Sequence, residues 1–280
     1  MPRPRGKRKL IRRVFRRVLD HECVEIAGEM AFDFAFSIFP AALFTASLVG
    51  LLGITPEFVS KALDVLGILI PEVVRKMVDQ NIRHLVSASS QKLLTLGFLG
   101  AVWAASSAIS ATMKALSRAY GVLETRSFWR RRALSVGLLV GVGLATAISF
   151  NLFILGNWFE EHLLVQLGVE EMFPALIALF KWPVGFLGAM AGASLLYRLA
   201  PNCSPRLFQV MPGAVLFAVL WSLIALAFGY YVSHFSYYNK VFGILGAFII
   251  LQLWIYLTAL ILLVGGELNA ELYQQKRSTT

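Results

Sequence analysis

Acidic side chains recur at helical spacing where the first long apolar segment of the chain begins. Glu22, Glu29 and Asp33 fall on one narrow arc of a helix, with Glu25 at its edge, since residues three or four apart share a helix face. Asp33 stands among alanine and phenylalanine, and a carboxylate in hydrocarbon is costly. We expect this acidic stripe to face a bundle interior or a wet vestibule, as a substrate pathway through Glu29, Asp33, Ser37 and Pro40.

The alternative for Asp33 is purely structural. A neighbouring cationic loop residue such as Arg118 would then neutralise it for assembly of the helices. Pro40 removes one backbone hydrogen bond deeper in the same segment and permits a kink. Both interpretations stay open.

Two other sets of polar residues are candidates for the pathway. Lys181 and Pro183 interrupt the fourth apolar segment, although the lysine stem is long enough to snorkel outward. Glu267 and Asn269 follow a Gly-Gly pair at the end of the last segment, where a plain helix terminus also accounts for them.

The usual catalytic and metal-binding motifs are missing from the sequence. There is no Gly-rich phosphate loop and no nucleophile elbow. His21 lies one turn from Glu25, but no third metal ligand stands nearby in sequence. The sequence therefore predicts no catalytic residue, no metal and no cofactor.

Composition indicates the class of protein that must position these side chains. Of 280 residues, 58% are apolar and 15% charged, with a mean hydropathy of +0.69, which is far too little charge for a soluble surface. The net charge of +10 comes from basic residues that flank apolar runs. Anionic lipid headgroups are therefore the expected partner, and nucleic acid is not.

The apolar segments predict an all-α, polytopic membrane protein with six transmembrane helices. A hydrocarbon core needs about 20 apolar residues per helix. The expected spans are 31–54, 93–113, 133–156, 173–197, 208–233 and 241–266.

Loop charges predict the orientation. Nine Lys or Arg residues precede the first span, and the loop after the second holds Arg118 and Arg126 among others. The loop between the third and fourth spans has no Lys or Arg and four glutamates. The positive-inside rule therefore puts both termini in the cytoplasm.

Two amphipathic segments are expected to lie on the membrane surface. The run from Leu10 to Leu19 has one apolar half, and its other half should contact lipid headgroups through Arg12, Arg13, Arg16 and Arg17. The outer loop, at about 55–92, reads as two short helices that form either a lid or a gate. The expected organisation is a basic N-terminal segment at 1–30, a six-span bundle at 31–270 and a tail at 271–280.

Several stretches resemble the bacterial YihY / virulence factor BrkB family, once labelled ribonuclease BN. They are AGEMAFDFAFSIFPAALF in the first span, ALSRAYGVLETRSFWRRR in the cytoplasmic loop after the second span, YRLAPN, MPGAVLFAVLW, and the closing LWIYLTALILLVGGELNAEL. Ser117 stands where that family's pattern has Asn. The resemblance covers nearly the whole chain and implies a six-helix protein of the bacterial inner membrane.

The leading hypothesis is a transporter-like or flippase-like protein for a lipid-like or amphiphilic molecule. The rival is a non-transporting scaffold or envelope-integrity factor, in which the buried charges only hold helices together. A membrane-associated ribonuclease is a distant third. The substrate and the oligomeric state are left open.

Overall fold

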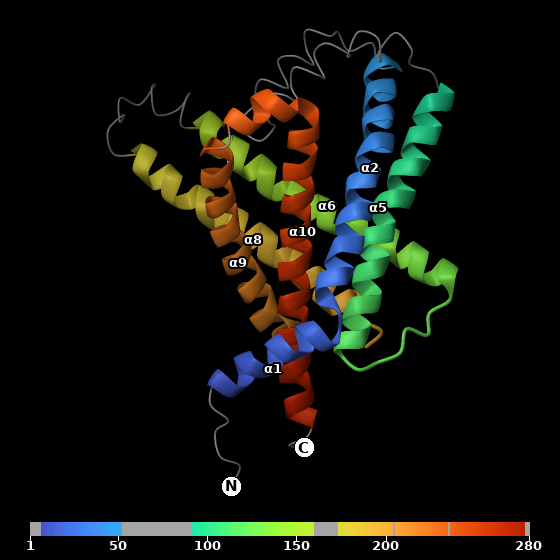
Figure 1. Cartoon of the computed structure of the whole chain (residues 1–280), viewed down its shortest axis with the longest axis vertical. Helices are drawn as coiled ribbons and strands as arrows, with labels where there is room; N and C mark the ends of the chain where they lie inside the picture. The colour runs from blue at the N-terminus through green and yellow to red at the C-terminus, as the bar shows by residue number, and fades with distance from the viewer. Residues whose placement is uncertain (1–6, 52–90, 160–172, 204, 235, 278–280) are drawn as a thin grey trace. The chain divides into compact units, whose positions relative to one another are not determined.

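The computed structural model describes residues 7–51, 91–159, 173–203, 205–234 and 236–277, and all regular elements in these ranges are helices (Figure 1). The predicted outer loop, about 55–92, lies almost wholly outside them. The helices are α1 (Lys7–Asp20), α2 (Cys23–Leu51), α5 (Gln91–Ala119), α6 (Phe128–Phe159), α8 (Phe173–Leu199), α9 (Leu207–His234) and α10 (Ser236–Arg277).

Four stretches of the described helices are long and apolar enough to cross a membrane. They are Gln91–Ala119, Phe128–Ser149, Leu207–Tyr231 and Phe248–Lys276. The predicted class, a helical membrane protein, is confirmed. The six long helices of the described residues overlap the six predicted spans.

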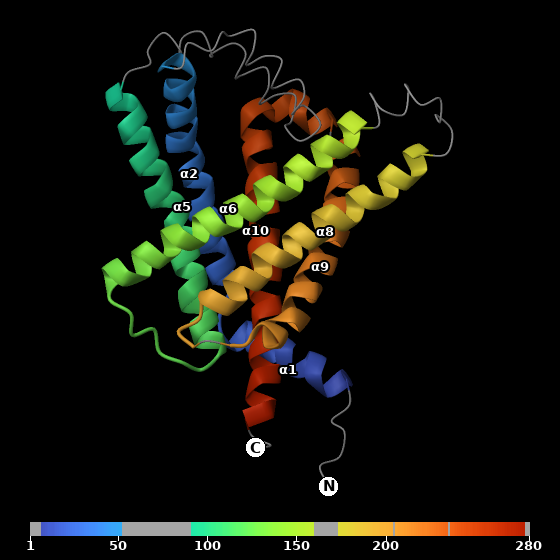
Figure 2. The same ribbon diagram turned by 180° about the vertical axis from the view of Figure 1, so that it is seen from behind.

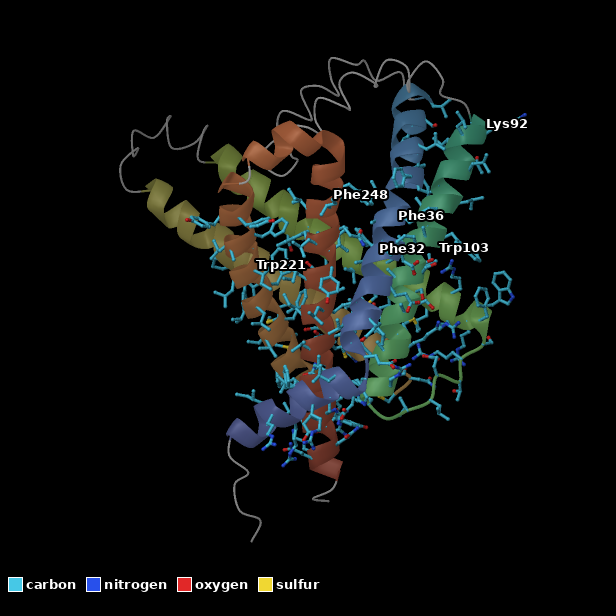
Figure 3. The ribbon with its side chains drawn as sticks, in the orientation of Figure 1. Phe32, Phe36, Lys92, Trp103, Trp221 and Phe248 are labelled. Carbon is cyan, nitrogen blue, oxygen red and sulfur yellow. The ribbon has the colours of Figure 1, made fainter. Side chains whose placement is uncertain are left out.

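Large apolar side chains are exposed along these helices. Phe32 and Phe36 on α2 and Trp103 on α5 are each more than half exposed (Figure 3). An exposed apolar surface of this kind is unfavourable in water but ordinary where lipid is the solvent. It agrees with the membrane class.

The chain divides into two compact units. Unit 1 comprises residues 1–27, 109–225 and 260–280, and unit 2 comprises residues 28–108 and 226–259.

In unit 1, helices α6 and α8 pack against each other along their lengths (Figure 2). Small residues make this possible. A Cβ atom added to Gly188 would overlap the side chain of Ser149, and one added to Gly141 would lie 2.8 Å from Leu195. Ser149 itself donates a hydrogen bond to the Ala145 carbonyl at 2.8 Å. Gly141 therefore lies in the close contact with α8, whereas Gly137 and Gly185 have nothing within 4 Å.

In unit 2, α2 and α5 lie side by side in both views (Figures 1 and 2). They pack closely at Pro40 and Phe44. A Cβ on Gly97 would lie 2.6 Å from the Phe44 backbone nitrogen, and one on Gly100 would lie 3.1 Å from the proline ring. The Phe44 and Phe98 rings meet beside this point, with centroids 5.4 Å apart. The two glycines therefore seat the proline-containing turn of α2.

The last helix is longer than the span predicted in it. The span is expected at 241–266, and α10 runs from Ser236 to Arg277. It continues past Gly266 because the polar residues beyond that point are buried against partners in unit 1. The change from apolar to polar residues after Gly266 predicts a helix end at that point. The tertiary contacts of the polar residues stabilise the helix beyond it.

Candidate functional site

Two stripes of opposite charge meet where α1 lies across the end of α10, within unit 1 (Figures 1 and 2). Arg13 and Arg17 of α1 and His21 directly after it recur every fourth residue, and Glu267 and Glu271 do so on α10. Residues four apart share a helix face. These five residues, together with Gln274, form what we call the α1–α10 clamp.

Arg17 lies at the centre of the clamp. Its Nε donates to Glu267 Oε2 at 2.9 Å, and its Nη1 donates to Glu271 Oε2 at 3.3 Å and to Gln274 Oε1 at 2.8 Å. Its Nη2 donates to the carbonyl of Ala119 at the end of α5. Arg13 Nη1 adds a bond to Glu271 Oε1 at 3.1 Å. One guanidinium thus connects three helices.

Glu267 is the most buried carboxylate of the clamp, with its side chain 1% exposed. His21 Nδ1 lies 2.5 Å from Oε1, opposite the Arg17 contact on Oε2. The Cys23 thiol points at the same Oε1 from 3.9 Å. Burial, together with the negative charge of Glu267, raises the pKa of the Cys23 thiol to about 12. The thiol therefore stays protonated at physiological pH.

Asn269 makes a second set of contacts, with the backbone of α9. Its Oδ1 accepts the Gly213 N–H at 2.7 Å, and its Nδ2 donates to the Val210 carbonyl at 3.0 Å. Pro212 lies between these two residues and has no N–H to give to the helix. The fully buried amide thus bonds the backbone on both sides of the proline.

Close backbone contact explains the glycines around Asn269. A Cβ on Gly213 would overlap the Gly265 carbonyl, and a Cβ on Gly265 would lie 2.7 Å from the Gly213 carbonyl. Tyr197 closes the same region by donating from its hydroxyl to the Leu262 carbonyl at 2.6 Å. A side chain at either glycine would therefore push α9 and α10 apart.

Arg126 ties together the loop after α5 and the loop after α8. Its Nε donates to Asn202 Oδ1 at 3.1 Å, and its Nη2 donates to the Ala200 carbonyl at 2.8 Å. Glu124 pairs with it at 3.2 Å. Asn202 returns a bond from Nδ2 to the Leu123 carbonyl at 2.8 Å. The predicted loop residue Arg126 therefore joins two connections of unit 1.

Ser117 belongs to the same network, at the position where Asn was expected. Its hydroxyl accepts the Asn202 N–H at 3.0 Å and donates to Glu124 Oε2 at 3.2 Å. The chain turns directly afterwards at Gly121, with φ of 69°. The Val122 N–H bonds the Ser117 carbonyl at 3.0 Å and the Gly121 N–H bonds the Arg118 carbonyl at 2.9 Å, which is the Schellman pattern that ends a helix.

The four arginines predicted to contact headgroups have different surroundings. Arg13 and Arg17 are half-buried in the clamp, whereas Arg12 and Arg16 are exposed. The other predicted loop residue, Arg118, is exposed and pairs with Glu22 at 3.3 Å. Arg118 therefore meets the first acid of the predicted stripe.

The remaining predicted pathway residues lie on α2 and α8. Glu29 is exposed, Asp33 is half-buried, and Ser37 is buried and donates to the Phe34 carbonyl at 2.6 Å. Pro183 is exposed. The side chain of Lys181 lies outside the described residues. None of these residues belongs to the clamp.

The interpretation of Glu267 and Asn269 as a plain helix terminus is wrong, because both are buried inside α10. Sequence reasoning also missed His21, Tyr197 and Gln274 as their neighbours. One signal for the clamp is present in the sequence. Arg13, Arg17 and His21 recur every fourth residue, and the oppositely charged Glu267 and Glu271 have the same spacing. No comparable signal marks Tyr197, whose partner is a backbone carbonyl.

The polar atoms of the α1–α10 clamp and of Asn269 bind other groups of the protein. Within the described ranges, no group of three His, Cys, Asp or Glu side chains is arranged to hold a metal. The carboxylates of the clamp face cations, and the Asn269 amide uses both of its polar atoms on α9. Such an arrangement fixes helix ends relative to one another.

A family model described as "Virulence factor BrkB" matches residues 14–280. The chain is 30% identical to the ribonuclease-like protein YfkH of Bacillus subtilis over 270 residues, which is 95% of this chain and 96% of the relative. It is 26% identical to a UPF0761 membrane protein of Pseudoalteromonas translucida, over 91% of this chain and 82% of the relative. No solved structure matches the chain.

Proposed function

Because this chain belongs to the virulence factor BrkB family, we propose that it is a six-span protein of the bacterial inner membrane that moves or exposes a lipid-like or amphiphilic molecule. Both termini lie in the cytoplasm in this proposal, since basic residues are concentrated in the N-terminal segment and in the loop after α5.

The observation that carries the proposal is the acidic stripe on α2. Glu29 is exposed and Asp33 half-buried on a helix that otherwise bears Phe32, Phe36 and other apolar side chains. An ionisable group is expensive against lipid tails and is expected to border water or a polar substrate. An amphiphile with a charged or polar head and an apolar tail suits a surface on which acids and phenylalanines alternate.

The packing of Pro40 supports movement on the same helix. Pro40 lacks the N–H that would hold the Phe36 carbonyl in the helix. Gly97 and Gly100 of α5 pack closely against this turn. Because helices kink at prolines, a bend of α2 at Pro40 would change its contact with these two glycines.

The clamp and the Asn269 contacts hold the helix ends in this proposal. Glu267 and Asn269 were candidates for the pathway, but their polar atoms are engaged by protein groups. We therefore assign the substrate pathway to Glu29, Asp33, Ser37 and Pro40. No catalytic chemistry is assigned.

The test is leaflet exchange of fluorescent phospholipids by purified protein in liposomes. Wild type should exchange the lipids, and Asp33→Asn should reduce exchange at least tenfold without loss of protein from the membrane. Asp20→Asn is the matched control, because it makes the same change on an exposed residue of α1. Equal exchange by the Asp33 and Asp20 variants would contradict the pathway.

The second candidate is a non-transporting scaffold, and the clamp favours it. A network that joins α1, α5 and α10 through one arginine fixes helices in place, which is all that a scaffold requires. This candidate predicts that Asp33→Asn lowers protein abundance and nothing else. No exchange of any amphiphile by well-folded wild type would make the scaffold the better proposal.

A ribonuclease role, suggested by the name of the Bacillus subtilis relative, is the distant alternative. It requires RNA cleavage by purified protein, with the activity lost on substitution of named side chains. Cleavage that disappears on further purification would belong to a contaminant.

A further inference from the structure

Helix α1 has three faces, of which one is used by the clamp. Val14 and Val18 are buried on the side of the helix next to Arg13 and Arg17, which pair with α10, so this face is docked. The next arc around the helix is apolar yet exposed, with Ile11 at 69%, Phe15 at 65% and Leu19 at 55%. The third arc carries the exposed Arg12 and Arg16.

The helix that carries these exposed faces crosses α10 where the buried residues of α10 change from aliphatic to polar. Before Gly266 the buried residues of α10 are aliphatic, and from Glu267 onward they are mainly polar or charged. Helix α1 runs across α10 at this point in both views (Figures 1 and 2). A helix that crosses a transmembrane helix and carries an exposed apolar arc beside a basic arc is of the kind that lies along a membrane surface.

We infer that the two exposed faces of α1 bind the surface of an anionic lipid leaflet. Ile11, Phe15 and Leu19 enter the boundary between headgroups and acyl chains, while Arg12 and Arg16 bind the anionic headgroups. Arg13 and Arg17 take no part, because the clamp uses them. This inference does not depend on whether the protein moves an amphiphile.

Charge complementarity is what selects lipid as the occupant. An apolar stripe beside a basic stripe matches the layering of acyl chains beneath anionic headgroups. Asp20, at the end of the helix, is the one acid that α1 contains. A protein partner or a second copy would also cover the apolar stripe, and the experiment below separates these occupants.

The experiment places a nitroxide spin label on α1 in the full-length chain, reconstituted in phosphatidylcholine vesicles with or without phosphatidylglycerol. The background is Cys203→Ser, since Cys23 is buried and its thiol is protonated. Labels at Phe15→Cys and Arg16→Cys report the apolar and basic faces. Accessibility to oxygen and to a polar nickel chelate measures the depth of each label.

The Phe15 label should be reached by oxygen and shielded from nickel, and the Arg16 label should be open to nickel. Omitting phosphatidylglycerol should raise nickel access to the Phe15 label severalfold. In a chain that also carries Arg12→Gln, this dependence on phosphatidylglycerol should be weaker. Equal nickel access at both labels would overturn the inference. Shielding of Phe15 from both reagents would also overturn it, by showing a protein occupant.

A matched pair of variants keeps the test independent of folding. Arg12→Gln and Arg13→Gln remove the same charge from adjacent positions. The first should reduce the effect of phosphatidylglycerol on the Phe15 label while leaving thermal unfolding unchanged. The second should lower thermal stability through the clamp. The reverse pattern would overturn the division of roles.

Discussion

Arg17 on α1 and Glu267 on α10 are 250 residues apart in sequence, and Arg17 Nε lies 2.9 Å from Glu267 Oε2. The Glu267 side chain is 1% exposed and that of Arg17 is 17% exposed. A carboxylate buried to this degree is tolerated only while its cationic partner stays in place. The pair therefore fixes the N-terminal helix to the last helix of the chain.

Glu267→Gln should lower the free energy of unfolding by about 3 kcal/mol, because it leaves Arg17 and His21 beside a neutral amide. Chemical unfolding in detergent micelles, followed by circular dichroism, measures the change. Arg12→Gln is the control, with an expected effect within about 0.5 kcal/mol. The Arg17→Gln/Glu267→Gln double variant should cost less than the sum of the singles, and strict additivity would contradict direct coupling.

Gly213→Ala should destabilise the protein more than an ordinary helical substitution would. The added methyl group overlaps the Gly265 carbonyl and the Asn269 amide, so it displaces both hydrogen bonds of Asn269. We expect a loss of about 2–4 kcal/mol, from overpacking and unpaired buried amide groups. Gly229→Ala is the matched control on α9, since nothing lies within 4 Å of that position. A similar midpoint for the two variants in thermal unfolding would contradict the close contact.

Tyr197 and Tyr120 give a paired test of buried hydroxyls. The Tyr197 hydroxyl donates to the Leu262 carbonyl at 2.6 Å, whereas among the described residues the buried Tyr120 hydroxyl has no hydrogen-bond partner. Tyr197→Phe should cost about 1–2 kcal/mol, and Tyr120→Phe should be neutral or slightly stabilising. Thermal unfolding of the two variants side by side checks the difference. Equal losses would mean that both hydroxyls are bonded.

The sequence was a good guide to helices and a poor guide to their partners. Runs of about 20 apolar residues located the six long helices, and the alternation from Leu10 to Leu19 located α1. Periodicity also placed Arg12, Arg13, Arg16 and Arg17 on one polar half. Periodicity could not show which of these arginines pair with α10 and which stay exposed, because that depends on where Glu267 and Glu271 lie in space.

Glu267 and Asn269 show why the end of the last helix was misplaced. A change from apolar to polar residues indicates a membrane boundary, but it does not say whether the polar residues meet water or protein. Here they meet Arg17, His21 and the backbone of α9. Contacts between residues more than 50 positions apart have no local signature, unless matched charge stripes at four-residue spacing are sought on both helices.

The Cys23 thiol should resist alkylation at a pH at which ordinary thiols react. An unperturbed cysteine titrates near 9.0, whereas burial, together with the charge of Glu267, raises the pKa of Cys23 to about 12. In a Cys203→Ser chain at pH 9.5, iodoacetamide should therefore modify the folded protein at least tenfold more slowly than the same chain unfolded in SDS. Mass spectrometry of the modified peptide measures both rates.

The raised pKa of Cys23 also makes the free energy of unfolding depend on pH. The folded state holds the Cys23 proton more tightly than the unfolded chain does, so this contribution to stability is complete below pH 9 and is lost as the pH rises toward 12. Glu267→Gln removes the second cause of the shift, so alkylation at pH 9.5 should become faster. Because burial is the larger cause, Cys23 in that variant should still react more slowly than in the unfolded chain. A rate in the folded wild type equal to that in the unfolded chain would show that Cys23 is neither buried nor held beside Glu267.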